Sequence, residues 1–348
     1  MAGTTRFAVV VASILLLLPG LLRPCTSFVF QSKGTLIFGS NYDNSIWPGL
    51  LFVNRKGVQK TGWEPGTTGR VAQWTAKYGS VTFNVAGLQL AWAGMNEAGL
   101  VMSTMLLSGT KNPPPDERPP LRSAFWMQYL LDTCASVEEV VAADKAVRMS
   151  ETVDHYLVAD STGDAAAVEF LDGRMVVHRG ESMPFKVLAN WPYAKCAEAL
   201  KRGETKDLRP YHSVARMSRV VERLKAFGSR GKGPAVDMAF ETLADVDSDS
   251  TQWSIVFDIA GRVVHFRSSR NTERRSIDLQ KLDFACGQPV GTLDVHAPLR
   301  GDISAAFKPY EPEAGVAFTL RFLKESGIAF PEEQIRALLQ AFESFPCK

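Results

Sequence analysis

The feature that most constrains this chain is the junction at residues 24–30 (PCTSFVF), where an apolar run gives way to the alternation of a β-strand. Before the junction, residues 7–18 are predominantly apolar and follow Arg6. After it, positions 25, 27, 29 and 31 lie on one face of an extended chain, because side chains of a strand alternate between two faces. A cysteine at such a junction is a lipidated anchor, half of a disulfide, or an N-terminal residue exposed by cleavage.

The first 24 residues have the pattern of a secretory signal. Arg6 supplies the positive charge, and the apolar run after it is short of the roughly 20 residues that a membrane-spanning helix needs. An uncleaved membrane anchor is the weaker alternative. We therefore predict a signal peptide or short propeptide over residues 1–24. The remaining chain is then an exported bacterial protein, periplasmic or secreted, without stable membrane contact after processing.

The charge of the remaining chain excludes one class of partner. Removing residues 1–24 takes away Arg6 and Arg23 and no acids, so the formal net charge falls from +2 to zero. A neutral chain with interspersed charges lacks the basic surface of a nucleic-acid-binding protein. The 324 residues from 25 to 348 are enough for one large core, and no linker or repeat divides them, so we predict a single domain over residues 25–348.

The cysteines and histidines favour a thiol over a metal site. Five cysteines in an exported chain leave one free thiol. With Cys25 set aside, the other four can pair in three ways or not at all: Cys134, Cys196, Cys286 and Cys347. The five histidines are scattered, and no C-x-x-C or H-E-x-x-H pattern occurs, so we expect neither a metal nor a cofactor.

The residues after the junction predict a β-hairpin. Residues 25–31 and 35–43 are β-prone, and Lys33 and Gly34 form a short turn between them. The second strand returns about as many residues as the first one leaves. Cys25 and Asp43 should therefore lie at the same end of the hairpin.

The later segments alternate between groups of strands and groups of helices, without a βαβ rhythm or a G-x-G-x-x-G motif. This order predicts an α+β protein with mostly antiparallel sheets covered by helices. Further strands are expected at 50–54, 79–85, 88–92, 100–107, 155–159, 165–170, 175–178, 186–189, 252–258 and 262–267. Helices are expected at 122–131, after Ser136, and at 193–201, 213–226, 235–244 and 331–342.

Six short motifs together resemble the choloylglycine hydrolase and penicillin V acylase family of N-terminal-nucleophile (Ntn) hydrolases. They stand in the family's order at residues 25–28 (CTSF), 38–43 (FGSNYD), 94–100 (GMNEAGL), 187–192 (VLANWP), 213–217 (SVARM) and 251–258 (TQWSIVFD). The resemblance implies a four-layer αββα sandwich with two mostly antiparallel sheets. It implies hydrolysis of linear amides, a small-molecule N-acyl amide as substrate, and a possible homotetramer.

The resemblance also implies roles for individual residues. Cys25 is similar to the family's nucleophile, and Asp43 to the aspartate that orients its α-amine. Asn190 is similar to the asparagine whose side-chain amide stabilises the oxyanion, and Arg216 to the arginine beside the nucleophile, where a cation would favour thiolate. Each of these residues also has an ordinary structural explanation when taken alone.

Two further positions are candidates for the pocket. A backbone N–H near Leu106 is expected to complete the oxyanion hole, and Trp47 to line the acyl pocket. Ser40 stands where bile-salt hydrolases often carry arginine, which weakens the case for a bile salt or another substrate with an anionic leaving group. Penicillin V, N-acyl homoserine lactones, bile amides and N-acyl amino acids all remain possible substrates.

The mechanism expected is attack by the Cys25 thiolate, with its own α-amine as base, through a thioester. An α-amine has a pKa near 7.7–8.0 and so titrates close to neutral pH. Because Pro24 precedes Cys25 and no A-x-A site is present, we expect cleavage upstream, near Pro19, and then removal of a short remnant, a step that Cys25 itself could perform.

Three alternatives stay open at this point. An acyltransferase of the same fold would pass the acyl group to an amine. A lipoprotein with acylated Cys25 would be a binding protein of the envelope, although Arg23 and Pro24 make a poor lipobox. A relative with Cys25 in a disulfide would be inactive.

Overall fold

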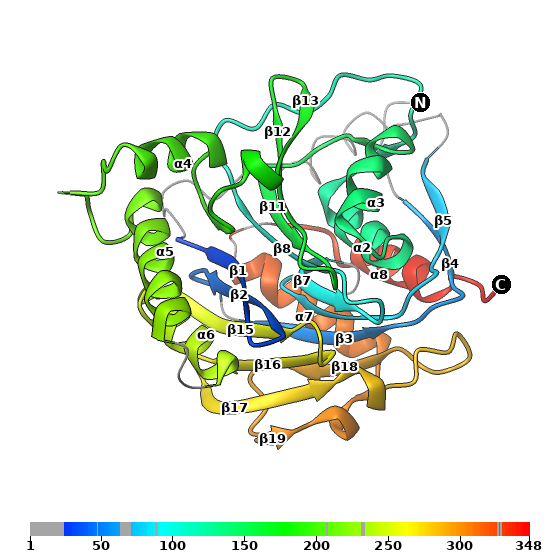
Figure 1. Ribbon diagram of the computed structural model, residues 1–348. Helices are drawn as coiled ribbons and strands as arrows, with labels where there is room; N and C mark the ends of the chain where they lie inside the picture. The colour runs from blue at the N-terminus through cyan, green and yellow to red at the C-terminus, as the bar shows by residue number, and fades with distance from the viewer. Residues whose placement is uncertain are drawn as a thin grey trace.

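The computed structural model describes residues 24–46, 48–62, 71–87, 90–206, 208–230, 234–325, 327 and 329–348. Two large sheets lie face to face, and helices cover the outer face of each one (Figure 1). The chain is thus an α+β protein with the four layers αββα, as the sequence predicts. Except for the short β19, neighbouring strands of the two large sheets run antiparallel.

The first sheet, here called sheet A, carries the predicted hairpin at β1 and β2. Its strands follow the order β14-β1-β2-β15-β16-β17-β19. They are β1 (Thr26–Ser32), β2 (Thr35–Asp43), β14 (Val187–Ala189), β15 (Thr251–Asp258), β16 (Val263–Ser268), β17 (Asn271–Asp278) and β19 (Gly301–Asp302).

The second sheet, sheet B, is wider and follows the order β13-β12-β11-β8-β7-β6-β3-β18-β20. Its strands are β3 (Leu50–Asn54), β6 (Ser80–Asn84), β7 (Ala91–Asn96), β8 (Val101–Leu106), β11 (Asp154–Ala159), β12 (Ala165–Leu171), β13 (Arg174–Arg179), β18 (Gly291–Asp294) and β20 (Lys308–Pro309). Two small strand pairs stand apart from it, namely β4 (Gln59–Thr61) with β5 (Gln73–Thr75), and β9 (Pro120–Leu121) with β10 (Arg148–Met149).

The helices are divided between the two outer faces. Sheet A is covered by α4 (Tyr193–Lys201), α5 (Ser213–Arg230) and α6 (Ala235–Ala244). Sheet B is covered by α2 (Ser123–Thr133), α3 (Val137–Ala142), α7 (Pro312–Glu325) and α8 (Glu332–Glu343). The short 3₁₀ segments are η1 (Ala143–Lys145), η2 (Gly180–Ser182), η3 (Leu279–Lys281) and η4 (Ser304–Ala306).

The hairpin is joined to sheet B by hydroxyl groups as well as by apolar packing. Ser27 of β1 lies opposite Ser40 of β2, and their Oγ atoms are 2.7 Å apart. The Ser27 Oγ atom also lies 2.8 Å from that of Ser103 in β8. All three side chains are fully buried. This contact between the sheets fixes the face of β1 that carries Cys25, because residues two apart in a strand share a face.

The structure moves two of the elements expected from the sequence, adds elements that were not expected, and gives the cysteine pairing that the sequence left open. The strand predicted at 88–92 is β7 (Ala91–Asn96), and residues 88 and 89 lie outside the described part. Pro331 is the N-cap of α8 and not its first residue. Both β17 and α7 were missed, because β17 is rich in charged residues and α7 carries glycine in its first turns. Cys286 and Cys347 form a disulfide, while Cys134 and Cys196 are buried free thiols.

Candidate active site

Cys25 lies where the hairpin begins, and the hairpin brings Asp43 to its side as predicted. Thr26 pairs with Asn41, so the same register brings Tyr42 level with Cys25, and Asp43 is the next residue along β2. The Asp43 backbone N–H donates to the Cys25 Sγ atom at 3.5 Å, and Sγ lies 3.8 Å from the Asp43 carbonyl oxygen. The thiol is 4% exposed and therefore sits inside the molecule, between the two sheets.

Arg216, in the first turn of α5, holds the backbone around Cys25. Its Nη1 atom donates to the Pro24 carbonyl oxygen and to the Thr26 Oγ1 atom, each at 2.6 Å, and also to the Cys25 carbonyl oxygen. Its Nη2 atom donates to the Asn190 Oδ1 atom at 2.9 Å. The guanidinium is 1% exposed, so these bonds replace its lost hydration. One buried cation thus joins the peptide bond before Cys25 to Asn190.

Asn190 follows β14 directly and reaches across to sheet B. Its Nδ2 atom donates to the Leu106 carbonyl oxygen at 2.9 Å. A primary amide carries two N–H groups, so one remains for a substrate oxygen. The Leu107 N–H donates to Val153 of the neighbouring segment. Because successive N–H groups of a strand point to opposite sides, that of Leu106 points away from β11.

Asp43 is fully buried and only partly satisfied. Its Oδ1 atom accepts from Thr251, at the start of β15, and from the Ser248 hydroxyl at 3.4 Å. Its Oδ2 atom is buried and has no hydrogen-bond partner among the described residues. A buried oxygen without a donor is costly, and such groups call for an explanation. An ammonium group formed at Cys25 by cleavage would be a suitable donor.

The protonation states at this site are set mainly by burial. Burial, followed by the charge of Asp43, raises the pKa of the Cys25 thiol to about 12, although Arg216 acts in the opposite direction. Burial likewise raises the pKa of Asp43 to about 7. Burial lowers the pKa of Arg216 to about 10, so it remains a cation at neutral pH. The expected activation of the thiol by Arg216 is therefore outweighed in this structure, and the thiol is protonated at neutral pH.

The structure brings most, but not all, of the candidate site residues together. Cys25, Asp43, Asn190, Arg216 and Leu106 come together, whereas Trp47 lies outside the described residues. Ser40 does not line an open space, because it is fully buried against Ser27. Sequence reasoning gave no role to Thr26 and Thr251, although each lies within a motif that was used.

A buried acid also supports the Asn190 turn from the second sheet. The Glu169 Oε1 atom accepts the Tyr193 N–H at 2.9 Å, at the start of α4, and lies 3.0 Å from His155 Nδ1. Its Oε2 atom lies 3.4 Å from His178 Nε2. Burial opposes its ionisation, but the two neighbouring histidines and the Tyr193 N–H hold the pKa of Glu169 at about 2. The carboxylate thus fixes the helix that begins three residues after Asn190.

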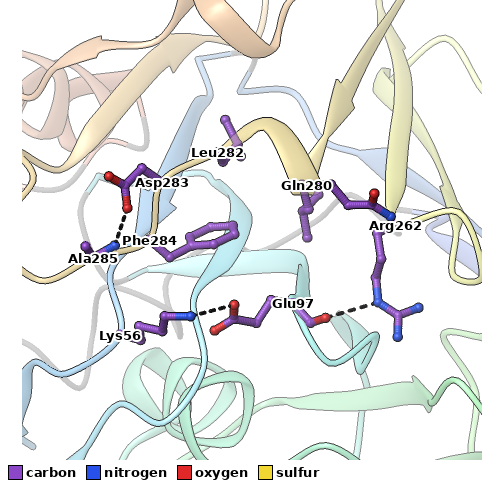
Figure 2. Close-up of a pocket in the computed structure, with 9 residues that line it drawn as sticks. Lys56, Glu97, Arg262, Gln280, Leu282, Asp283, Phe284 and Ala285 are labelled. Carbon is purple, nitrogen blue, oxygen red and sulfur yellow. Dashed lines mark hydrogen bonds and ion pairs between the residues drawn. The ribbon is translucent and has the colours of Figure 1, made fainter.

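A hollow of about 350 Å³ lies at the other end of the sheets, and the charged side chains that line it are paired with one another or with the backbone (Figure 2). The Lys56 Nζ atom lies 2.9 Å from Glu97 Oε2, and Arg262 Nε donates to the Glu97 carbonyl oxygen at 3.1 Å. Asp283 accepts the Ala285 N–H. Each of these charged groups has a partner within the hollow. In the described part of the chain, no group of three His, Cys, Asp or Glu side chains is arranged for a metal ion.

Comparison with known proteins gives a consistent family. The family model described as linear amide C–N hydrolases, choloylglycine hydrolase family, matches residues 25–218. A penicillin V acylase from Pectobacterium atrosepticum is 32% identical over 138 residues, which is 34% of this chain and 36% of that protein. The alignment therefore spans about a third of the curated relative's length.

Solved structures extend the likeness over most of the chain. A penicillin V acylase from Agrobacterium tumefaciens superposes with a TM-score of 0.71 and 25% identity, over 83% of this chain and 98% of that one. A mutant of the conjugated bile acid hydrolase from Clostridium perfringens gives a TM-score of 0.65 at 18% identity, over 77% and 96%. The second of these likenesses concerns the fold alone.

Proposed function

Because the chain belongs to the linear amide C–N hydrolases of the choloylglycine hydrolase family, we propose that it cleaves small N-acyl amides with Cys25 as an N-terminal nucleophile. One observation carries this proposal. Arg216 bonds to the carbonyl oxygen before Cys25 and to Asn190 at once, so the nucleophile and the oxyanion donor share one buried support.

Activation begins with the Pro24–Cys25 peptide bond. The Pro24 carbonyl oxygen accepts from Arg216 at 2.6 Å and from the Thr26 hydroxyl at 3.4 Å, so charge that develops on this oxygen meets two donors. The Cys25 sulfur attacks the Pro24 carbonyl carbon and loses its proton to the departing nitrogen. The C–N bond breaks, which leaves a thioester and a free α-amine. Water then hydrolyses the thioester and releases the remnant.

The freed amine supplies the base that the buried thiol lacks. It accepts the thiol proton while Asp43 Oδ2 accepts a hydrogen bond from it, and the thiolate attacks the substrate carbonyl carbon. The oxyanion accepts from Asn190 Nδ2 and from the N–H of Leu106. The protonated amine of Cys25 then gives its proton to the leaving nitrogen, the C–N bond breaks, and water hydrolyses the acyl-enzyme.

The site favours neutral amides over conjugated bile acids. Ser40 is a fully buried, short side chain that bonds to Ser27, which in turn bonds to Ser103, so no long cation extends from that position. Arg216 uses its donors on the protein itself. A substrate carboxylate or sulfonate would therefore find no cation at these two positions. N-acyl homoserine lactones, which are uncharged N-acyl amides, are therefore the amides to test first, and penicillin V, which carries a carboxylate, is the anionic comparison.

Several features support export and argue against lipidation. The Cys286–Cys347 disulfide is of the kind that persists in oxidising compartments, in agreement with the signal-like residues 1–24. Within the described residues, no helix has the length and apolar character needed to cross a bilayer. The Cys25 thiol is buried between the sheets, where a diacylglyceryl group has no space. We also propose a homo-oligomer, up to a tetramer, which sedimentation velocity would measure.

The decisive experiment compares wild type, Cys25→Ala and Cys134→Ala on a panel of linear amides. Cys134 is a buried free thiol on the side of α2, so its variant controls for the loss of a core sulfur. We expect hydrolysis by wild type and Cys134→Ala and none by Cys25→Ala. Undiminished hydrolysis by Cys25→Ala would overturn the proposal.

A further inference from the structure

The large apolar side chains that are exposed in the described part of the chain are not scattered. They are Leu106, Trp191 and Tyr211, which are 40%, 43% and 51% exposed. Single exposed apolar residues on a surface are ordinary. These three, however, come from three distant segments and all border the candidate active site. We call them the apolar rim.

Each member of the apolar rim is tied to a site residue through its backbone. The Leu106 carbonyl oxygen accepts from Asn190, and Trp191 follows Asn190 directly. The Tyr211 carbonyl oxygen accepts from Arg216 Nε at 3.1 Å. The backbone of the rim is therefore fixed by the same bonds that fix the site.

One wall of the rim is braced by a ring contact. The Trp191 and His212 rings meet nearly edge to face, with centroids 4.4 Å apart. His212 thus supports one side of the indole and leaves other parts of it exposed to solvent. An aromatic ring held in this way offers a large apolar surface at little cost in side-chain entropy.

A single carboxylate lies beside the rim. Asp154, the first residue of β11, stands directly opposite Leu106. Opposite residues of an antiparallel pair place their side chains on the same side. Asp154 is partly exposed as a residue. Burial raises its pKa to about 6, and its charge raises the pKa of the Cys25 thiol, so it is an anion near the reacting centre at neutral pH.

We propose that the apolar rim binds the apolar acyl chain of an N-acyl amide, and that Asp154 disfavours substrates with negative charge near the scissile bond. This inference rests on the proposed function and narrows it to one substrate class. A chain of several methylenes would cover the exposed faces of Trp191 and Tyr211. Each methylene removed from water would raise kcat/KM by up to about fourfold.

The test uses two series of synthetic amides. In the first series one neutral amine carries straight acyl chains of increasing length. In the second series one acyl chain is joined to glycine or to glycinamide, which differ by one negative charge. The proteins are wild type, Trp191→Ser, Tyr211→Ser and Asp154→Asn. Tyr78→Ser is the control, because Tyr78 precedes β6 at the far end of sheet B.

For wild type and Tyr78→Ser we expect kcat/KM to rise with chain length and glycinamide to be preferred. Trp191→Ser and Tyr211→Ser should reduce the ratio of long-chain to short-chain kcat/KM by about tenfold. Asp154→Asn should raise the ratio of glycine to glycinamide kcat/KM by about tenfold. Using ratios within one variant cancels any effect of these changes on the thiol itself.

Failure of this inference is separable from failure of the proposed function. If wild type hydrolyses amides but both ratios stay unchanged in the variants, the substrate class is wrong and the hydrolase remains. If no amide is hydrolysed, calorimetric titration of Cys25→Ala with the same amides still tests the rim. Binding that tightens with chain length, and that Trp191→Ser weakens in this background, supports it; binding independent of chain length contradicts it.

Discussion

The two ends of the sandwich use arginine in similar ways and reach different results. At one end Arg216 donates to the carbonyl oxygens of Pro24 and Cys25. At the other end Arg262 donates to the carbonyl oxygens of Glu97, Ala98 and Ile259. Each guanidinium holds together segments that are distant in sequence. Arginine bonds to a backbone therefore do not distinguish a reactive site from a structural one.

The difference lies in what remains unsatisfied. In the hollow of Figure 2, Lys56, Glu97 and Asp283 each have a partner nearby. At the Cys25 end, Asp43 Oδ2 has no partner in the described chain, and the pKa values of Asp43 and Cys25 are both raised. A hollow alone is thus a weak sign of function. Titratable side chains whose pKa values are shifted by burial, with exposed apolar side chains beside them, are a stronger sign.

The largest effect is expected from exchanging the two arginines for methionine in separate variants. Arg216→Met leaves buried carbonyl oxygens without donors and releases Asn190, so kcat/KM should fall by about a thousandfold or more. Arg262→Met should lose stability while keeping its activity. Kinetic assays with thermal unfolding of both variants would measure this. Equal losses of activity in the two variants would contradict the assignment of a catalytic site to the Arg216 end of the sandwich alone.

The next effect concerns Asn190 alone. Asn190→Ala removes one donor to the oxyanion, so we expect kcat to fall about 10²–10³-fold with a smaller change in KM. Steady-state kinetics on the best amide would test this. A change confined to KM would mean that Asn190 binds the substrate and does not stabilise the transition state.

A third effect is a pH-dependent change in stability at Asp43. Its pKa is raised to about 7 in the folded, uncleaved chain, against about 3.9 when unfolded. Between about pH 4 and pH 7 the folded chain therefore keeps a proton on Asp43 that the unfolded chain releases. The contribution of Asp43 to the free energy of unfolding is complete below about pH 4 and is lost as the pH rises through about 7. In a Cys25→Ala background, Asp43→Asn should gain relative stability by at most about 4 kcal/mol between pH 4 and pH 8.

Denaturant unfolding of the Asp43 pair at several pH values would measure this change. The background variant keeps the peptide bond before residue 25 intact, so no α-ammonium interacts with the carboxylate. Asp154 titrates in both proteins and cancels in the difference. A difference in unfolding free energy that does not change with pH would show that the pKa of Asp43 is not raised in the folded protein.

The smallest effect is expected in the hollow. Lys56 is 47% exposed on its side chain, and an exposed ion pair contributes about 1 kcal/mol at most. Lys56→Met should leave amide hydrolysis unchanged and shift the free energy of unfolding by less than that amount. A marked loss of activity in this variant would give the hollow a function after all.

The sequence predicts those parts of the site that depend on contacts between residues close together in the chain. The hairpin follows from two β-prone runs about Lys33 and Gly34, and its register puts Asp43 within one residue of the position level with Cys25. The joining of Asn190 to Leu106 and Arg216 depends on how two sheets stack, which no local pattern specifies. The family resemblance, and not the spacing of the residues, supplied these partners in advance.

Other features could not be found from sequence patterns. β17 is a charged strand that pairs with β16 and the short β19, so it lacks the apolar alternation of a buried strand. The raised pKa of Cys25 depends on how deeply the thiol is buried, which only the fold decides. The exposure of Trp191 and Tyr211 runs against the usual burial of aromatic residues and so is visible only in three dimensions.

The most direct test of the central claim is the mass of the active enzyme before and after reaction with an amide. Intact mass and peptide mapping should place Cys25 at the N-terminus, and acid quenching during turnover should add the mass of the acyl group to the N-terminal peptide. An active protein that retains residues before Cys25, or an acyl group carried on any other residue, would contradict the account.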